Sequence, residues 1–103
     1  MLGGDKEDDL DGGEGDDWIE GGDGKDDIYG GLGSDLIEGR EKDDKLYGGN
    51  NNSVEADGDD LIYGGDGKDQ LYGEAGDDVL VGGDGKAKLK GGASTELFIL
   101  EDE

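Results

Sequence analysis

The sequence predicts an all-β solenoid in which two short parallel sheets are built from coils of 18 residues, about five coils in all. A nine-residue repeat runs through residues 3–99, and each unit has a large apolar residue at its eighth position. The first six residues of the units are rich in Gly and Asp. Self-similarity at a fixed short period is typical of solenoid architectures.

The repeat has ten units when the chain is divided into nines from Gly3. The first four units read GGDKEDDLD, GGEGDDWIE, GGDGKDDIY and GGLGSDLIE. The sixth unit begins at Gly48 and ends with GDDLIY at Tyr63, so we place an insertion of seven residues within 50–57. Reading GGNNNSVEA as a separate unit would instead point Glu55 into the core and leave the next unit without its paired glycines. The insertion keeps every position of the repeat in phase.

Two positions of the repeat are nearly invariant. The eighth position is always large and apolar: Leu10, Ile19, Ile28, Ile37, Leu46, Ile62, Leu71, Leu80, Leu89 and Phe98. The sixth position is Asp in eight units, with Ala87 and Glu96 as the departures: Asp8, Asp17, Asp26, Asp35, Asp44, Asp60, Asp69 and Asp78.

Each unit therefore consists of a six-residue turn and a three-residue strand. Neighbouring side chains of a strand point to opposite faces, so the eighth position faces inward while the seventh and ninth face outward. Successive strands alternating between two sheets would bring all the eighth positions together. Glycine at the first, second and fourth positions indicates backbone with positive φ or close approach of another chain segment. The density of glycine and the apolar spacing exclude helices.

Composition limits the chemistry. The chain has 31 acidic and 9 basic residues and a formal net charge of -22, so we expect no nucleic acid partner and no attraction to anionic membranes. No apolar run is long enough for membrane insertion, and no signal peptide is visible. The absence of Cys and His leaves oxygen as the ligand chemistry. Carboxylates recur in every turn and no pair stands apart, so we predict no enzymatic activity.

Stacking of the coils would bring the Asp carboxylates of one column close enough to repel each other, and bound cations would offset this repulsion. Coils repeat at about 4.8 Å, so adjacent Asp carboxylates of one column would repel by about 3 kcal/mol at an effective dielectric near 20. The core is thin and the chain highly charged, so we expect folding to require bound metal. Flexible turns that offer several carbonyl oxygens suit Ca²⁺ better than Mg²⁺.

The units resemble the Gly-Gly-x-Gly-x-Asp-x-U-x nonapeptide of RTX proteins. This resemblance implies a right-handed parallel β-roll with Ca²⁺ held between turns on the same edge, one coil apart. The ligands would be sixth-position carboxylates and main-chain carbonyl groups. One edge would use Asp8, Asp26, Asp44 and Asp69, and the other Asp17, Asp35, Asp60 and Asp78. The accompanying turn glycines would be Gly12, Gly13, Gly15, Gly21, Gly22, Gly24, Gly30, Gly31, Gly33, Gly64, Gly65 and Gly67.

The ten units allow at most about eight ions, and the sites should differ. Lys6, Arg40 and Lys42 replace expected glycines, which predicts weaker sites at Asp8 and Asp44. Two sixth-position substitutions weaken the last sites of the two edges: Ala87 and Glu96.

The resemblance also implies a segment of a bacterial protein secreted by a type I system or held at the cell surface. Two alternatives remain open: a calcium-rigidified adhesive spacer, or an accessory module of a secreted enzyme. Residues 91–103 would form the C-terminal end unit and cap, with Phe98 closing the core.

The outward positions differ between the two sheets. One sheet would present an apolar column suited to self-association or domain packing, made of Trp18, Leu36, Leu61, Val79 and Leu97. The other would carry a tyrosine column explained by cross-strand stacking, made of Tyr29, Tyr47 and Tyr72.

Overall fold

The computed structural model describes residues 2–49, 58–92 and 97–99, and every regular element among them is a β-strand. In this part of the chain there is no helix long and apolar enough to cross a membrane. The strands are β1 (Leu2–Gly4), β2 (Asp9–Asp11), β3 (Trp18–Gly22), β4 (Asp27–Tyr29), β5 (Leu36–Arg40), β6 (Lys45–Tyr47), β7 (Leu61–Gly65), β8 (Asp69–Tyr72), β9 (Val79–Val81), β10 (Ala87–Lys90) and β11 (Leu97–Ile99).

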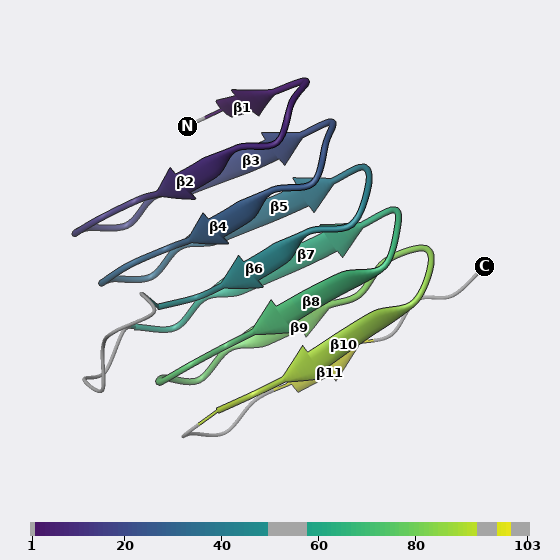
Figure 1. The fold of residues 1–103 in the computed structure, drawn as a ribbon. Coiled ribbons are helices and arrows are strands. Elements are labelled where there is room, and N and C mark those ends of the chain that lie inside the picture. The colour runs from purple at the N-terminus through teal and green to yellow at the C-terminus, as the bar shows by residue number, and fades with distance from the viewer. Residues whose placement is uncertain (1, 50–57, 93–96, 100–103) are drawn as a thin grey trace.

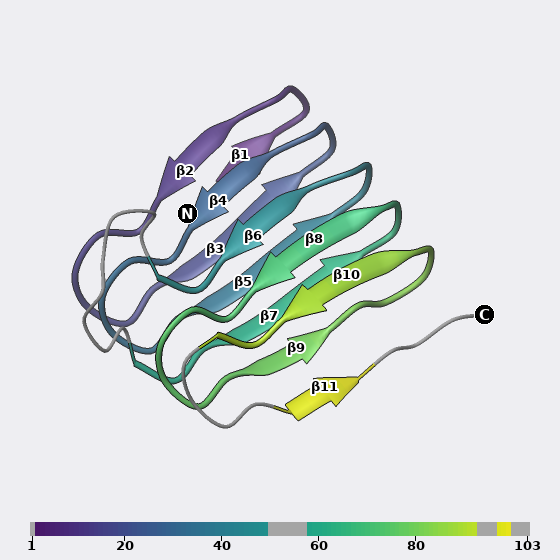
Figure 2. The ribbon, with the colours of Figure 1, turned by 60° about the horizontal axis from the view of Figure 1, so that its bottom comes forward.

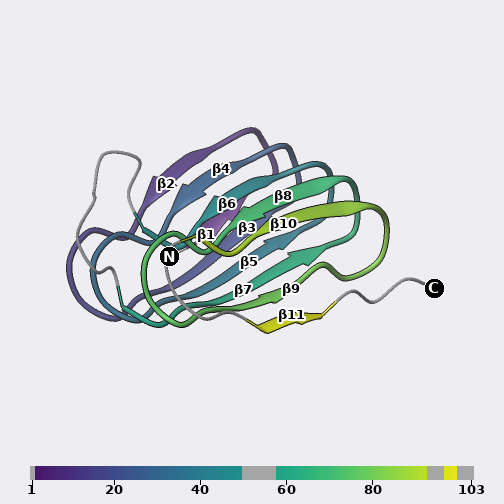
Figure 3. The same cartoon turned by 90° about the horizontal axis from the view of Figure 1, so that it is seen from below.

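The strands form two parallel sheets between which the chain alternates (Figure 1). Sheet A has the order β1-β3-β5-β7-β9-β11, and sheet B has the order β10-β8-β6-β4-β2. Viewed along the stack, the two sheets form two layers joined by turns at both edges (Figure 3). The predicted all-β solenoid with parallel sheets is confirmed.

The core is the single layer of eighth-position side chains between the sheets. Seven of them are fully buried: Ile19, Ile28, Ile37, Leu46, Ile62, Leu71 and Leu80. Leu10 and Leu89, at the two ends of this layer, are only partly buried and pack against it. The side chain of Phe98 lies outside the described part of the structure, so its predicted role as a plug stays a prediction.

Most neighbouring strands of a sheet are offset by 18 residues, as in the pairing of Ile19 with Ile37. Between β5 and β7 the offset is larger, because Ile37 pairs with Ile62, 25 residues further along. The additional seven residues are accommodated without moving Leu61 or Ile62 out of their columns. Residues 50–57 themselves lie outside the described residues.

Several strands are longer than the three residues that the sequence predicted. β3, β5 and β7 each continue into the first two residues of the following unit. Those residues still pair across sheet A, as Gly22 does with Arg40. β1 is an additional strand that joins Leu2 to the first two residues of the first unit, and its Leu2 and Gly4 pair with Glu20 and Gly22 of β3.

The two outer faces carry the columns expected from the sequence. In sheet A, Trp18 is 56% exposed and donates a hydrogen bond from Nε1 to Glu38 Oε1 at 3.3 Å. Its column continues through half-buried side chains at Leu36, Leu61 and Val79. The side chain of Leu97 is outside the described part. Self-association through this column remains a prediction.

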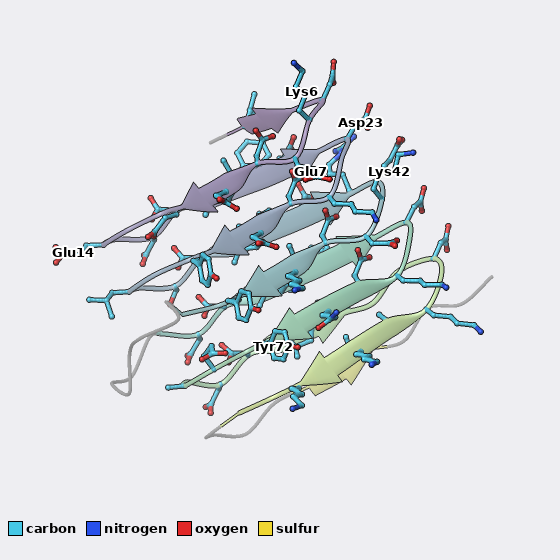
Figure 4. All side chains as sticks on the ribbon, viewed as in Figure 1. Lys6, Glu7, Glu14, Asp23, Lys42 and Tyr72 are labelled. Atoms are coloured by element: carbon cyan, nitrogen blue, oxygen red, sulfur yellow. The ribbon has the colours of Figure 1, made fainter. Side chains whose placement is uncertain are left out.

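The tyrosine column of sheet B is a continuous stack. The ring centroids of Tyr29 and Tyr47 are 4.7 Å apart, and those of Tyr47 and Tyr72 are 4.8 Å apart. The stack stands on the outer face of the sheet, where Figure 4 labels Tyr72. Cross-strand packing accounts for these rings without a ligand.

Candidate metal centre

The turns lie in two rows, one along each edge of the solenoid (Figure 2). The first edge holds the turns that run from sheet A to sheet B, with Asp8, Asp26, Asp44 and Asp69. The second edge holds the turns that run from sheet B to sheet A, with Asp17, Asp35, Asp60 and Asp78. Six of these side chains are at most 3% exposed, whereas Asp8 and Asp17 in the first coil are half-buried.

One carboxylate oxygen of each aspartate after the first coil is held by the coil before it. On the first edge, Asp8 N–H donates to Asp26 Oδ1 at 2.9 Å, and Asp26 N–H donates to Asp44 Oδ1 at 2.9 Å. On the second edge, Asp17 N–H donates to Asp35 Oδ1 at 2.7 Å. The same bond recurs along both columns, from Asp44 to Asp69, from Asp35 to Asp60 and from Asp60 to Asp78. These bonds fix how the carboxylates point.

The second carboxylate oxygen is buried. In five turns Oδ2 accepts no hydrogen bond: Asp8, Asp17, Asp26, Asp44 and Asp69. In Asp35, Asp60 and Asp78 the same atom is also buried. Burying a charged oxygen without a compensating partner is costly, so each of those five turns offers an oxygen suited to a cation.

The pKa values of three of these carboxyl groups, Asp26, Asp44 and Asp69, reflect the cost of burial. Burial raises the pKa of Asp44 to about 8, although the hydrogen bond from the Asp26 amide opposes this change. Burial likewise raises the pKa of Asp69 to about 7, and that of Asp26 moves in the same direction. The metal-free fold therefore favours protonated carboxyl groups, whereas a bound cation would favour ionised ones.

The first-position glycines leave open the space that Oδ2 faces. A Cβ on Gly12 would lie 2.7 Å from Asp17 Oδ2 and 2.6 Å from the carbonyl oxygen of Gly30 in the next coil. On the first edge, a Cβ on Gly21 would lie 2.5 Å from Asp26 Oδ2. A carboxylate oxygen and a carbonyl oxygen of adjacent coils thus border the same small space. Hard oxygen donors of this kind suit Ca²⁺.

The same arrangement recurs at glycines that the sequence analysis did not select. A Cβ on Gly39 would lie 2.6 Å from Asp44 Oδ2 and 2.8 Å from the Gly64 carbonyl oxygen. Gly73 has the same relation to Asp78 and Gly91. The sequence signal for both was the first-position glycine that precedes each sixth-position Asp.

Second- and fourth-position residues supply the left-handed backbone of the turn. Gly13 has φ 86° and Gly15 has φ 95°, and positive φ also occurs at Gly22, Gly24, Gly31, Gly33, Gly65 and Gly67. Arg40 (φ 81°) and Lys42 (φ 78°) adopt the same conformation despite their side chains. Such residues cost about 1–2 kcal/mol each. The turn at Asp44 therefore keeps the backbone conformation of the other turns, and the weaker site predicted there stays a prediction.

The column on the first edge ends at Ala87. Ala87 pairs with Asp69 in the sheet register but provides no carboxylate. Asp69 N–H donates instead to the carbonyl oxygen of Lys86 at 3.2 Å. At the end of the second edge, Glu96 lies outside the described residues.

A second hydrogen-bond column was not foreseen from the sequence. Asp16 Oδ1 accepts from Ser34 N–H at 2.8 Å, and Asp59 Oδ1 accepts from Asp77 N–H at 2.9 Å. On the first edge, Asp43 Oδ1 accepts from Lys68 N–H at 2.8 Å. The Asp-Asp pairs of the repeat were the available signal. These fifth-position side chains secure one turn to the next at the surface.

The exposed side chains of the turns spread outward. Figure 4 shows Lys6, Asp23 and Lys42 at the first edge and Glu14 at the opposite edge. Within residues 2–49, 58–92 and 97–99, no group of three or more acidic side chains gathers where it could hold a metal ion. A cation between coils must therefore draw on main-chain oxygens as well as carboxylates.

Comparison with known protein families agrees with this geometry. Residues 2–37, 29–52 and 56–86 match the family described as the RTX calcium-binding nonapeptide repeat (4 copies). No curated protein and no solved structure matches the chain. The matched segments span most of the repeats and both edges.

Proposed function

Since the chain belongs to the family of RTX calcium-binding nonapeptide repeats, and is thus a calcium-binding repeat module, we propose that it folds as it takes up several Ca²⁺ ions between its coils. The observation that carries the proposal is the buried Oδ2 atom, which faces the space left by a glycine and shares it with a carbonyl oxygen of the next coil. Asp17 with Gly30, and Asp44 with Gly64, are representative pairs.

Bound calcium supplies positive charge beside carboxylates that are otherwise disfavoured in their ionised form. The eight sixth-position aspartates and the first-position carbonyl groups would hold it. The sixth-position hydrogen bonds orient the carboxylates, and the glycines keep the space clear of side chains. With at most about eight ions, the net charge would fall from -22 to about -6. Binding would therefore relieve much of the self-repulsion that opposes folding.

The role that follows is structural. Each edge repeats one arrangement along its length, and no carboxylate pair among the described residues differs from its neighbours in a way that favours catalysis. We therefore propose a non-enzymatic module of a secreted bacterial protein exported by a type I system. Low cytosolic calcium would keep the chain unfolded for export, and extracellular calcium would fold it. A spacer in a surface adhesin or an accessory module of a secreted enzyme would use the same transition, and flanking sequence distinguishes these settings.

Circular dichroism during a calcium titration tests the proposal. We expect a disordered spectrum in chelator and a β-rich spectrum in calcium, with a much weaker response to magnesium. Asp26→Asn removes one buried charge and should raise the calcium midpoint about tenfold, because Oδ2 of that turn becomes a neutral ligand.

The matched control is Asp23→Asn, which removes the same charge from an exposed position of the same turn. Its calcium midpoint should change by less than about twofold. A β-rich spectrum in excess chelator that calcium leaves unchanged would contradict the proposed function. Equal shifts for Asp26→Asn and Asp23→Asn would contradict the assignment of the ligands.

A further inference from the structure

Two strands lie at the ends of sheet B in the described part of the chain. β2 and β10 are its outermost strands, and within the described residues each pairs with a single neighbour, β4 or β8. Unpaired backbone groups on such strands are a template for pairing with another chain. Leu10 and Leu89 on these strands are only partly buried, whereas the seven core residues between them are fully buried. The apolar layer is thus incompletely covered at both ends.

The two end strands carry opposite charge. β2 reads Asp-Leu-Asp, and Asp9 and Asp11 are exposed. β10 reads Ala-Lys-Leu-Lys, and Lys88 and Lys90 are exposed. In each strand the charged residues flank a core leucine and point to the outer face of sheet B.

Sheet B pairs equal positions of successive repeats. Lys88 lies opposite Gln70 and Leu89 opposite Leu71, while Asp9 lies opposite Asp27. If the same register continued for one more coil, β2 of a second copy would lie beside β10 of the first copy and pair with it. Lys88 would then lie opposite Asp9, Leu89 opposite Leu10, and Lys90 opposite Asp11.

We propose that two copies of this chain associate head to tail, with β10 of one copy pairing in parallel with β2 of the next. The pairing joins the two incomplete ends of the core layer through Leu89 and Leu10. It also places two lysines opposite two aspartates, and opposite charges directly across a strand pair stabilise it. The inference concerns the ends of the solenoid and goes beyond the calcium-binding role of its edges.

The hydrogen bonds of the first edge fit this continuation. Within the chain, the main-chain N–H of a sixth-position residue donates to the carboxylate one coil later, as Asp8 does to Asp26. At the junction the donor would be the N–H of Ala87 and the acceptor Asp8 of the next copy. Because the donor is a main-chain group, the absence of a carboxylate at Ala87 does not prevent the bond.

The lysine charges at the junction would also offset the repulsion between two aspartates of sheet B. Asp9 lies opposite Asp27 in sheet B, and like charges in this position repel. A lysine on the other side of Asp9 compensates for that repulsion. Among the described strands of sheet A, β1 and β11 are outermost at the same ends, and Leu2 is 73% exposed. If the register of sheet A continues in the same way, Ile99 of one copy lies opposite Leu2 of the next.

The test measures mass in solution against protein concentration, by sedimentation in calcium at low salt. The wild type should associate reversibly, and added NaCl should weaken the association because the charges are exposed. Two charge-reversed variants are compared, Asp9→Lys with Asp11→Lys and Lys88→Asp with Lys90→Asp. Each alone has two ends of like charge, so its association should weaken about tenfold or more. An equimolar mixture should associate again, because each variant then offers the charge that the other needs.

Matched controls place the same charge changes in the turns of the middle coils. Glu41→Lys with Asp66→Lys, and Lys42→Asp with Lys68→Asp, change exposed residues away from both ends and should leave association nearly unchanged. Circular dichroism in calcium checks that each variant folds. A wild type that fails to fold in calcium would contradict the proposed function, whereas a folded wild type that stays monomeric would overturn the head-to-tail proposal.

Two further results would overturn it. The first is a mixture of the reversed variants that stays as weakly associated as either variant alone. The second is association that both charge-reversed variants retain and that Trp18→Thr loses. That result would place the contact on the outer face of sheet A.

Discussion

At the scale of single residues, Gly12 shows how a missing side chain shapes the site. Replacing it with Ala would place a Cβ within 2.7 Å of both Asp17 Oδ2 and the Gly30 carbonyl oxygen, which are proposed to hold the same ion. Side chain and ion cannot share this space, and such crowding also costs about 1–3 kcal/mol. We expect Gly12→Ala to bind one calcium ion fewer than the wild type, as measured by equilibrium dialysis.

Gly13→Ala is the control for this prediction. Gly13 has φ 86°, and no atom would lie within 4 Å of an added Cβ. This variant should lose about 1–2 kcal/mol of stability through backbone strain. It should nevertheless keep the full number of ions once calcium saturates. An unchanged ion count in Gly12→Ala would show that the space beside Asp17 is not a calcium position.

At the scale of the elements, the tyrosine stack joins three strands of sheet B. Tyr47 in β6 contacts rings on both sides, whereas Tyr29 in β4 contacts one within the stack. Each stacked pair contributes about 0.5–1.5 kcal/mol beyond burial of surface. Urea unfolding at saturating calcium should therefore show Tyr47→Leu to lose about twice as much stability as Tyr29→Leu. Equal losses of stability would mean that each ring contributes by its own burial and that contacts between rings add nothing.

The elements also show what the sequence could and could not predict. Ile19, Ile37 and Leu80 could be assigned to the core because a strand alternates its faces and the repeat keeps a fixed period. β1 could not be assigned, because Leu2 precedes the first unit and Gly4 was expected in a turn, and both become a strand only through pairing with β3. The weaker site predicted at Asp44 because of Arg40 and Lys42 stays a prediction, but the sequence alone could not show that both residues adopt the positive φ of the glycines they replace.

The atoms of the site were less predictable than its residues. The spacing of Asp26 and Asp44 indicated a column of carboxylates on one edge. It could not show that Oδ1 binds the main chain of the preceding coil while Oδ2 faces the open space. That division depends on how the coils stack, which is a tertiary property. The second hydrogen-bond column through Asp16 and Asp43 was missed for the same reason.

At the scale of the whole molecule, protons should partly replace calcium. Burial raises the pKa of Asp44 from an ordinary value of 3.8 to about 8, and that of Asp69 to about 7. The metal-free fold therefore holds protons that the unfolded chain has released. This contribution to stability is complete below about pH 3.8 and is lost as the pH rises to about 8. With calcium bound the dependence should reverse, because the ion requires ionised ligands.

Small-angle scattering of calcium-free protein tests this dependence. The folded chain has a radius of gyration of 11.9 Å, whereas an unfolded chain of this length would measure about 30 Å. Lowering the pH from 8 to 6 should move the measured radius toward the folded value, before ordinary carboxyl groups titrate near pH 4. Calcium must be removed by a chelating resin, because soluble chelators weaken in acid. Asp44→Asn with Asp69→Asn should flatten the response between pH 6 and 8, whereas Glu14→Gln at an exposed position of the opposite edge should preserve it. A radius that grows as the pH falls would show that burial of these carboxyl groups does not govern the metal-free fold.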